Sequence, residues 1–278
     1  MSCLITIIIA THNREGTLQQ CIDSVTQQTY PHKELIAIDG GSKDGTVELL
    51  KANSQRIRYW ISEPDRGIYH AWNKALPRAR GEWICFLGAD DFFWDAAVLM
   101  RVSEHLRNLS PKIRVVYGQN MLVNDRGEHL YAVGASWQTL KGKFRTSMCL
   151  PHPGMMHHRS LFEQHGMFDE SFRIAGDYEM LLRELKQADA LFIPNLIMAG
   201  VRQGGISSNP DAALRVLSEA RRAHRMHGQK LPSLPWLRSV IKVYLRLLLW
   251  RLLGERVGRS ALDLGRQMFN QPKHWTKT

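Results

Sequence analysis

Two adjacent carboxylates, Asp90 and Asp91, directly follow an apolar stretch of the chain. Residues 83–87 are continuously apolar, which predicts a strand covered on both faces, as in a parallel sheet. Neighbouring carboxylates repel each other, and a divalent cation offsets that repulsion because Mg²⁺ and Mn²⁺ prefer oxygen ligands. One interpretation is therefore a metal that carries a diphosphate. The other is a solvated loop in which an aspartate caps the next helix.

Polar residues also follow three earlier strands that the sequence predicts. Short apolar or β-branched runs cover residues 4–10, 34–38 and 57–61, and a helical period of apolar residues follows the first and the third. The order βαβαβαβ indicates a parallel sheet with right-handed crossovers. In such sheets the ligand crevice lies outside the carboxyl ends of the strands. We therefore expect one site formed by the side chains of Thr11, Asn13, Asp39, Asp65, Asp90 and Asp91.

The chain beyond residue 110 carries further strand signals. Residues 114–117 and 119–123 are predicted strand segments, and a turn at 124–127 leads into a returning strand at 129–133. We expect this part to extend the sheet and to form the acceptor side of a site. Neither GxGxxG nor GxxxxGK[ST] occurs, so the sequence does not support a dinucleotide fold or a P-loop.

Asp177 begins a predicted helix with an apolar face formed by Tyr178, Leu181, Leu182 and Leu185. An aspartate at this position has a structural interpretation as an N-cap stabilised by the helix dipole. The Gly/Ser-rich segment at residues 202–208 is either a lid or a connection.

The net charge of +11 comes from one end of the chain. Residues 1–211 carry 23 basic and 23 acidic side chains, whereas residues 212–278 carry 14 basic and 3 acidic ones. A neutral body with a basic tail indicates a tail that meets an anionic surface. We divide the chain into a catalytic domain at 1–211, with halves 1–110 and 111–211, and a helical tail at 212–278.

The four cysteines lie far apart and form no CxxC spacing, which predicts thiols in a reducing compartment instead of disulfides or zinc ligands. The apolar run at the N-terminus lacks a preceding basic segment, so we expect no signal peptide.

Residues 235–256 predict a basic amphipathic helix. Trp and Leu side chains from Trp236 to Trp250 form one broad face, and Arg238, Lys242 and Arg246 lie on the other side. Basic residues interrupt the segment too often for a membrane span, which needs ~20 mostly apolar residues. The composition is typical of a helix in a membrane interface. Packing on the catalytic domain or in a dimer is the alternative.

An ordered set of motifs carries a resemblance to a known family. The motifs are IDGGSKDGT at residues 38–46, EPDRGIY at 63–69, NK at 73–74, ADD at 89–91, GDY at 176–178 with Arg183, and GGISS at 204–208. Together they resemble the family-2 glycosyltransferases, above all the bacterial members that build exopolysaccharide and O-antigen repeat units. The resemblance implies a GT-A fold, an α/β architecture with a mostly parallel sheet and flanking helices. It also implies an inverting, metal-dependent transfer from a nucleotide sugar.

The resemblance implies a role for each residue at the strand ends. Thr11, Asn13 and Asp39 would hold the nucleotide base and ribose, with Asp39 accepting from the base edge. Asp65 and Asp90 would complete the nucleoside pocket.

Two further carboxylates would carry the chemistry that the resemblance implies. Asp91 would ligate the Mn²⁺ or Mg²⁺ ion that bridges the diphosphate, and the ion would stabilise charge on the leaving group. Asp177 would be the general base for the acceptor hydroxyl, which is a weak nucleophile.

Three more side chains are candidates for contacts with the acceptor or the phosphates, namely His152, Lys74 and Arg202. His70 stands where related sequences carry an acid, so the chain departs from the family pattern at that position.

The sequence therefore predicts a cytoplasmic enzyme that is peripheral on the inner face of the cell membrane. Its partners would be a nucleotide sugar, a UDP-sugar before a GDP-sugar, a lipid-linked saccharide acceptor in surface polysaccharide biosynthesis and an anionic membrane surface. A metal-dependent nucleotidyltransferase is the alternative among enzymes. A basic nucleic-acid-binding protein is the alternative from another class, and the neutral charge of residues 1–211 argues against it.

Overall fold

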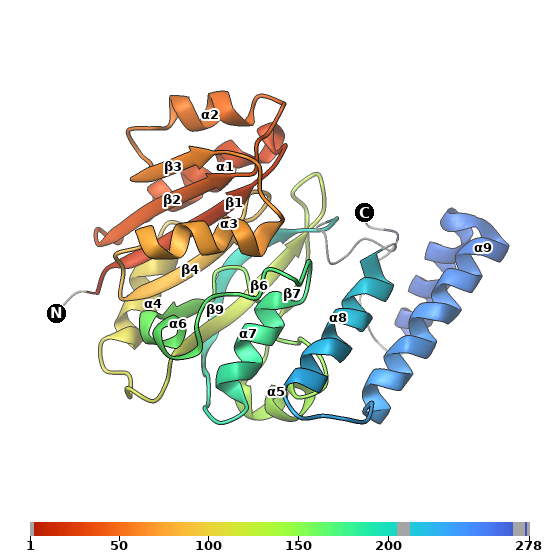
Figure 1. The fold of residues 1–278 in the computed structure, drawn as a ribbon. Helices are drawn as coiled ribbons and strands as arrows, with labels where there is room; N and C mark the ends of the chain where they lie inside the picture. The colour runs from red at the N-terminus through yellow and green to blue at the C-terminus, as the bar shows by residue number, and fades with distance from the viewer. Residues whose placement is uncertain (1–2, 205–211, 269–275, 277–278) are drawn as a thin grey trace.

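A nine-stranded mixed sheet forms the centre of the protein, in the strand order β3-β2-β1-β4-β8-β6-β9-β5, with β7 paired to β6. The computed structural model describes residues 3–204, 212–268 and 276. Helices cover both faces of the sheet, and Figure 1 shows α3 and α7 in front of it with α1 behind. The predicted α/β fold class is confirmed.

The N-terminal half alternates strands and helices as the sequence predicts. All neighbouring pairs among its first four strands are parallel. Its elements are β1 (Ile5–Thr11), α1 (Glu15–Thr26), β2 (Lys33–Asp39), α2 (Thr46–Ala52), β3 (Tyr59–Ser62), α3 (Ile68–Ala75), η1 (Leu76–Arg78), β4 (Trp83–Gly88), β5 (Phe92–Phe93) and α4 (Val98–Leu106).

The C-terminal half adds mostly antiparallel pairs, since β8 pairs antiparallel with both β4 and β6. The pair of β6 and β9 is parallel. Its elements are β6 (Val115–Val123), β7 (His129–Val133), α5 (Trp137–Phe144), β8 (Met156–His158), α6 (Arg159–His165), α7 (Gly176–Leu185), β9 (Leu191–Arg202), α8 (Ala213–Met226) and α9 (Leu234–Met268).

Strand β1 supplies side chains to both layers of the core because successive residues of a strand point to opposite faces. Ile5, Ile7 and Ile9 pack with residues of α1 and α4 on one face. Ile8 packs on the other face with Phe86 of β4 and residues of α3 and α7. All four cysteines are free thiols, and Cys21 and Cys85 are buried as expected.

Several element boundaries differ from the prediction for local reasons. The two predicted strand segments around Gly118 form the single strand β6. A Cβ atom on Gly118 would lie 2.5 Å from the carbonyl oxygen of Leu196, so the glycine permits close pairing with β9. Helix α4 begins at Val98 and not directly after β5, because Asp95 accepts a hydrogen bond from the Ala97 amide in a turn.

The elements that were not predicted from the sequence include β5, α5, β9 and α8. Pro194 and Asn195, the latter with a positive φ of 57°, interrupt β9 and hide its strand pattern. Helix α8 is rich in Arg and Ala and contains few large apolar side chains, so it gives a weak hydrophobic signal although its apolar residues keep helical spacing.

Helices α8 and α9 lie side by side at one edge of the molecule, with α8 against α7 (Figure 1). The predicted helix at 235–256 is part of α9, which is interrupted at Gly254 with a φ of 75°. The Trp236 indole donates to the Leu217 carbonyl of α8 at 3.0 Å, so one side of α9 faces α8. In the described part of the chain, no helix is both long and apolar enough to cross a membrane. Whether a domain boundary lies at residue 211 stays a prediction.

A buried ion pair between β6 and α7 gives a stability prediction. The Arg114 guanidinium contacts the Glu184 carboxylate at 2.9 Å, with side-chain exposures of 16% and 1%. We expect Arg114→Met to lower the free energy of unfolding by roughly 1.5–3 kcal/mol, because the buried Glu184 carboxylate then keeps only the bond to His165 at 2.7 Å among the described residues. Lys141→Met, which breaks the exposed pair with Asp189, should cost about 0–1 kcal/mol. Urea denaturation measures both, and equal losses would contradict the prediction.

Candidate active site

The register of the parallel strands gathers the predicted strand-end residues at one edge of the sheet. Thr11 pairs with Asp39, Ala10 pairs with Gly88, and Asp39 pairs with Ser62. The backbone joins the loops that follow, since the Gly40 amide donates to the Thr11 carbonyl at 2.9 Å. The carboxyl ends of four strands therefore meet, as the sequence predicts.

The fully buried Asp39 carboxylate organises the loop after β2. It accepts from the amides of Gly41 and Ser42 at 3.1 and 2.9 Å and from the Ser62 hydroxyl of β3 at 2.6 Å. The Ser42 hydroxyl also donates to it. Asp39 thus fixes this loop to the end of β3 and holds the floor of the site rigid.

Asn13 connects the loop after β1 to the same place. Its backbone has a positive φ of 51°, which asparagine tolerates better than most residues. Its side-chain oxygen accepts from the Lys43 backbone amide at 2.9 Å, and its backbone amide donates to the Ser42 hydroxyl at 2.7 Å. The Thr11 hydroxyl is buried and has no hydrogen-bond partner among the described residues. It is therefore available to a ligand.

Asp65 reaches back over the loop after β2. Its carboxylate accepts from the Gly67 amide at 2.9 Å. A Cβ atom on Gly40 would lie 2.5 Å from the Asp65 carboxylate, so only glycine fits there without displacing Asp65. The approach of Asp65 thus explains Gly40, whereas Gly41 has a positive φ of 82°, which favours glycine.

Asp90 and Asp91 converge above the end of β4. A Cβ atom on Gly88 would lie 2.8 Å from an oxygen of each carboxylate. Burial raises the pKa of Asp91 well above its usual range, and the Asp90 charge raises it further. Arg202 at the end of β9 opposes this rise in the pKa of Asp91. Arg14 lies 3.8 Å from the other side of Asp90.

This pair of carboxylates fits a Mg²⁺ or Mn²⁺ ion. No cluster of three or more His, Cys, Asp or Glu side chains occurs in the described ranges, so the protein does not build a closed metal cage there. Mg²⁺ typically binds one or two carboxylates and completes its shell with water and substrate phosphates. A cation would also remove the repulsion that raises the pKa of Asp91.

Asp177 lies in the first turn of α7 and contacts α3. The Tyr69 hydroxyl is 3.2 Å from its carboxylate, and the Tyr178 amide donates to the same oxygen at 2.8 Å. Burial raises the pKa of Asp177 to about 6, although these hydrogen bonds oppose the shift. A carboxylate with a pKa close to neutral pH suits a general base.

The interpretation of Asp177 as the helix N-cap is wrong. The cap position is Ala175, and Asp177 lies two residues inside it. The amides of residues 173–175 are bound instead by Glu219 of α8, at 2.8–3.1 Å. The acceptor for the amides that lead into α7 is therefore Glu219 and not Asp177.

His152 lies beneath the site in an aromatic cluster. Its ring stacks on Trp72 of α3 at 5.4 Å between centroids, and its Nε2 has no hydrogen-bond partner within the described part of the chain. Burial lowers the pKa of His152 to about 4, so it is neutral at pH 7. A neutral imidazole suits a hydroxyl better than a phosphate.

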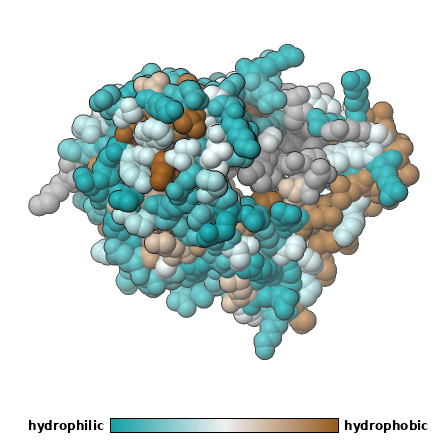
Figure 2. All heavy atoms as spheres, turned by 45° about the horizontal axis from the view of Figure 1, so that its top comes forward, coloured by the Kyte–Doolittle hydropathy of each residue, from teal (hydrophilic) through white to brown (hydrophobic). Residues whose placement is uncertain are grey.

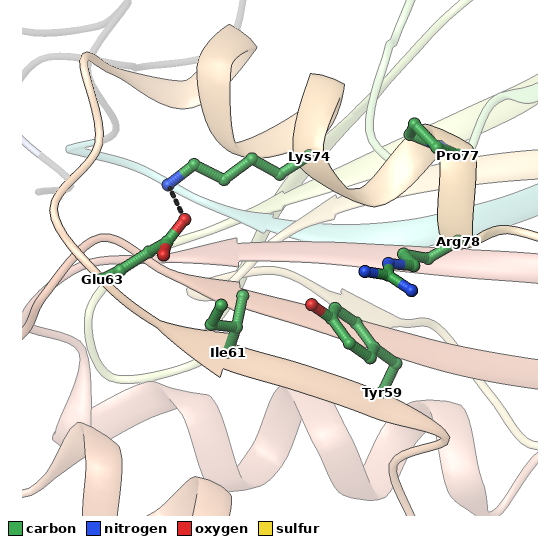
Figure 3. A pocket seen from close by; sticks show the side chains of 6 residues that line it. All are labelled: Tyr59, Ile61, Glu63, Lys74, Pro77 and Arg78. Atoms are coloured by element: carbon green, nitrogen blue, oxygen red, sulfur yellow. Dashed lines mark ion pairs between the residues drawn. The ribbon is translucent and has the colours of Figure 1, made fainter.

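Lys74 reaches the segment that follows β3, where it donates to the Pro64 carbonyl at 3.3 Å. It forms an ion pair with Glu63 at 2.8 Å inside a cavity of about 470 Å³ beside β3 (Figure 3). The cavity is lined by Tyr59, Ile61, Glu63, Lys74, Pro77 and Arg78. It contains none of the strand-end aspartates, so we do not assign it to the active site.

The sequence model for "Glycosyl transferase family 2" matches residues 6–164, more than half of the chain. This stretch contains every strand-end residue described above. The chain is a family-2 glycosyltransferase.

Relatives of this glycosyltransferase share part of its length. A "PGL/p-HBAD biosynthesis glycosyltransferase" of Mycobacterium bovis is 28% identical over 65% of this chain and 69% of the relative. The "Chondroitin synthase" of Pasteurella multocida is 33% identical over 65% of this chain, which amounts to 18% of that protein.

Solved structures share the GT-A fold of the glycosyltransferase. The mannosyltransferase PcManGT from Pyrobaculum calidifontis, in complex with GDP-Man and Mn²⁺, matches 94% of this chain and 75% of its own with a TM-score of 0.64 and 19% identity. S. aureus TarS 1-349 in complex with UDP-GlcNAc matches 79% of this chain and 66% of its own with a TM-score of 0.61 and 18% identity. The longer TarS structure is matched over 39% of its chain.

Three residues of the glycosyltransferase site were not predicted from the sequence: Tyr69, Ser62 and Glu219. Tyr69 lies in the EPDRGIY motif, which gave a signal for it. Glu219 gave no signal because its partners, the amides of residues 173–175, are backbone groups far away in the sequence. Residues 205–208, part of the segment interpreted as either a lid or a connection, lie outside the described residues.

Proposed function

We propose that the protein is an inverting, metal-dependent glycosyltransferase that moves a sugar from a nucleotide sugar to a lipid-linked saccharide in surface polysaccharide biosynthesis. The observation that carries this proposal is the convergence of Asp90 and Asp91 over Gly88, at the sheet edge that also holds Thr11 and Asp39. Carboxylates on this edge suit a cation and its diphosphate.

The donor would lie across the ends of β1, β2 and β3. The Thr11 hydroxyl and the Asn13 amide would hold the ribose and base, with Asp65 and Asp90 completing the pocket. Asp39 already accepts four hydrogen bonds from the protein, so a base would have to displace one of them. A UDP-sugar is our first candidate and a GDP-sugar the second, and the complexes of TarS and PcManGT with such donors support this class.

The diphosphate would lie between Asp91 and Arg202. Asp91, assisted by Asp90, would hold the Mn²⁺ or Mg²⁺ ion, which would stabilise the charge of the leaving diphosphate. Arg202 lowers the pKa of Asp91, so its guanidinium is close enough to the two carboxylates to add to this stabilisation. Lys74 would need to leave Glu63 to take part, so we assign it no phosphate contact in this conformation.

Asp177 would act as the general base. The acceptor oxygen forms a bond to the anomeric carbon while the bond from that carbon to the diphosphate oxygen breaks, and the bonding pair leaves with the diphosphate. The hydroxyl proton passes to the Asp177 carboxylate. Attack from the face opposite the leaving group inverts the anomeric configuration. His152 would contact an acceptor hydroxyl as a neutral imidazole.

The outer side of α9 supports membrane contact. An apolar stripe there is 40–70% exposed, and Figure 2 shows hydrophobic side chains gathered over α9 at the right of the view. By helical geometry, the exposed Arg238 and Lys242 flank this stripe on one side and Arg251 flanks it on the other. The stripe consists of Leu234, Leu237, Ile241, Tyr244, Leu245, Leu248 and Leu252.

This stripe differs from the face expected from the sequence, which included Trp236. That indole faces α8, so the broad apolar face divides into an inner side for packing and an outer side for the membrane. An apolar stripe between basic side chains complements anionic lipid, and we infer a peripheral enzyme on the inner face of the cell membrane. The enzyme would bind a lipid-linked acceptor at that surface.

The first prediction tests the donor and the metal together. Screened against nucleotide sugars with Mn²⁺ or Mg²⁺, the wild type should gain thermal stability and hydrolyse its donor slowly. Asp91→Asn should weaken nucleotide-diphosphate binding in Mn²⁺ by at least about 10-fold, because an amide is an uncharged, weaker ligand. Asp125→Asn, on an exposed turn, is the control. Equal wild-type affinity with and without Mn²⁺ would refute the metal assignment.

The second prediction concerns the base. Asp177→Asn should bind donor with unchanged affinity and lower kcat by roughly 10²–10⁴-fold, since an amide cannot accept the proton. In the wild type, kcat/KM should fall as the pH drops through about 6, where Asp177 becomes protonated. Near-normal turnover by the folded variant would move the search for the base elsewhere.

The third prediction concerns the membrane. The wild type should sediment with phosphatidylserine vesicles, more weakly at high salt, because each basic side chain near the surface adds about 1 kcal/mol that salt screens. The double variant Ile241→Asp with Leu248→Asp should lose binding by at least about 10-fold, as two exposed apolar anchors are removed.

The matched control is Met167→Asp with Met226→Asp, which changes two equally exposed apolar side chains outside the stripe. It should bind vesicles like the wild type. If the wild type ignores vesicles and runs as a dimer that the Ile241 and Leu248 variant splits, the stripe is a dimer contact and our membrane assignment fails.

A further inference from the structure

The backbone segment that leads into α7 is held from outside by the carboxylate of Glu219. This side chain of α8 is 9% exposed and accepts from the amides of Arg173, Ile174 and Ala175 at 2.8–3.1 Å. These amides directly precede the first helical residue, Gly176, and buried amides outside a helix need an acceptor. Because Asp177 follows Ala175 by two residues, fixing these amides also fixes the backbone that carries Asp177.

On the opposite side, α3 contacts the same segment through Tyr69. Its single hydroxyl proton is shared between the Ile174 carbonyl at 2.5 Å and the Asp177 carboxylate at 3.2 Å. A Cβ atom on Gly176 would lie 2.8 Å from the Tyr69 ring, so the absence of a side chain there lets α7 approach α3. Ile174 thus bonds to Glu219 through its amide and to Tyr69 through its carbonyl.

We propose that Tyr69 and Glu219 are the positioning residues of the general base, and that they act on its proton affinity in opposite directions. The proposal rests on the function assigned to Asp177 above. Tyr69 donates toward the carboxylate and favours its charged form, whereas Glu219 brings a second negative charge close to it and disfavours that form. The two residues together would set both the place and the protonation of Asp177.

The other charged groups near this turn contact partners other than Asp177. Glu179, one helical half-turn further on, is bound by Arg183 and by His227, which directly follows α8. The Arg173 guanidinium lies beside Gly67 in the loop before α3. The lowered pKa of Glu179, which follows from its bonds to His227 and Arg183 despite its burial, keeps that carboxylate charged at pH 7. Tyr69 and Glu219 are thus the side chains whose change acts on Asp177 directly.

The assignment gives α8 a part in catalysis although it lies beyond the family match, which ends at residue 164. Helix α8 also holds α9, since the Leu217 carbonyl accepts from the Trp236 indole. Residues that contact the segment before Asp177 and the inner side of α9 therefore lie on one helix.

The test uses the full-length protein with Tyr69→Phe and Glu219→Gln. Three quantities are measured: the pH dependence of kcat/KM with the donor found in the screen, the donor Kd, and the pH titration of the Asp177 carboxyl carbon by ¹³C NMR, assigned with Asp177→Asn. Tyr69→Phe should move the acidic limb and the NMR midpoint up by roughly 1 pH unit. Glu219→Gln should move both down by roughly half a unit.

Both variants should lower kcat by at least about 10-fold and leave the donor Kd unchanged, because the carboxylate is misplaced without loss of the nucleotide pocket. Tyr117→Phe is the control for the phenol, since Tyr117 is equally buried and donates to the Ala135 carbonyl at 2.8 Å. Glu184→Gln is the control for a buried carboxylate. Both controls should lose stability without moving the acidic limb.

Unmoved limbs and NMR midpoints in both test variants would overturn the proposal and leave the glycosyltransferase function intact. If the wild type turns over no nucleotide sugar, the proposed function fails, and the proposed control of Asp177 still stands or falls with the NMR midpoints. Should Glu219→Gln not fold, Glu219→Asp keeps the charge on a shorter side chain. It should then lower kcat with an unmoved acidic limb, and a moved limb would contradict the assignment.

Discussion

The parallel pairing of β1 with β2 and β4 is the constraint on which the site depends. It sets Thr11 opposite Asp39 and Ala10 opposite Gly88, so the carboxyl ends of three strands stop at one level. A slip of one residue would turn every side chain of a strand to the other face and break the core. Because Ile7 and Ile8 are fully buried on opposite faces, the hydrophobic core fixes the register and with it the position of the polar ends.

Several close approaches at this edge need glycine. Gly40 makes room for Asp65, and Gly88 makes room for Asp90 and Asp91. The result is a concentration of carboxylates in which burial, and then the charge of Asp90, raise the pKa of Asp91. The strain of bringing like charges together is offset when a cation binds there, which is the physical link between the fold and the metal that we propose.

The second half of the chain brings Asp177 to this edge and supports it from outside. Its helix packs against α3 through Tyr69 and against α8 through Glu219, and α8 in turn packs against α9. The basic, Leu-rich helix α9 therefore has two sides with different surroundings. Its inner residues pack on the helices that hold α7, and its outer stripe is exposed between basic side chains.

The sequence by itself determined the alternating first half, the polar residues at its strand ends and Asp177, because apolar periods and short motifs are local signals. It also predicted the helix after residue 234, although not which side of it packs. Only the tertiary structure decided the mixed pairing of the later strands, the role of Glu219 on α7 and the ion pair of Lys74 with Glu63. These features depend on contacts between segments far apart in the chain, and a backbone amide 46 residues from its acceptor leaves no pattern in the sequence.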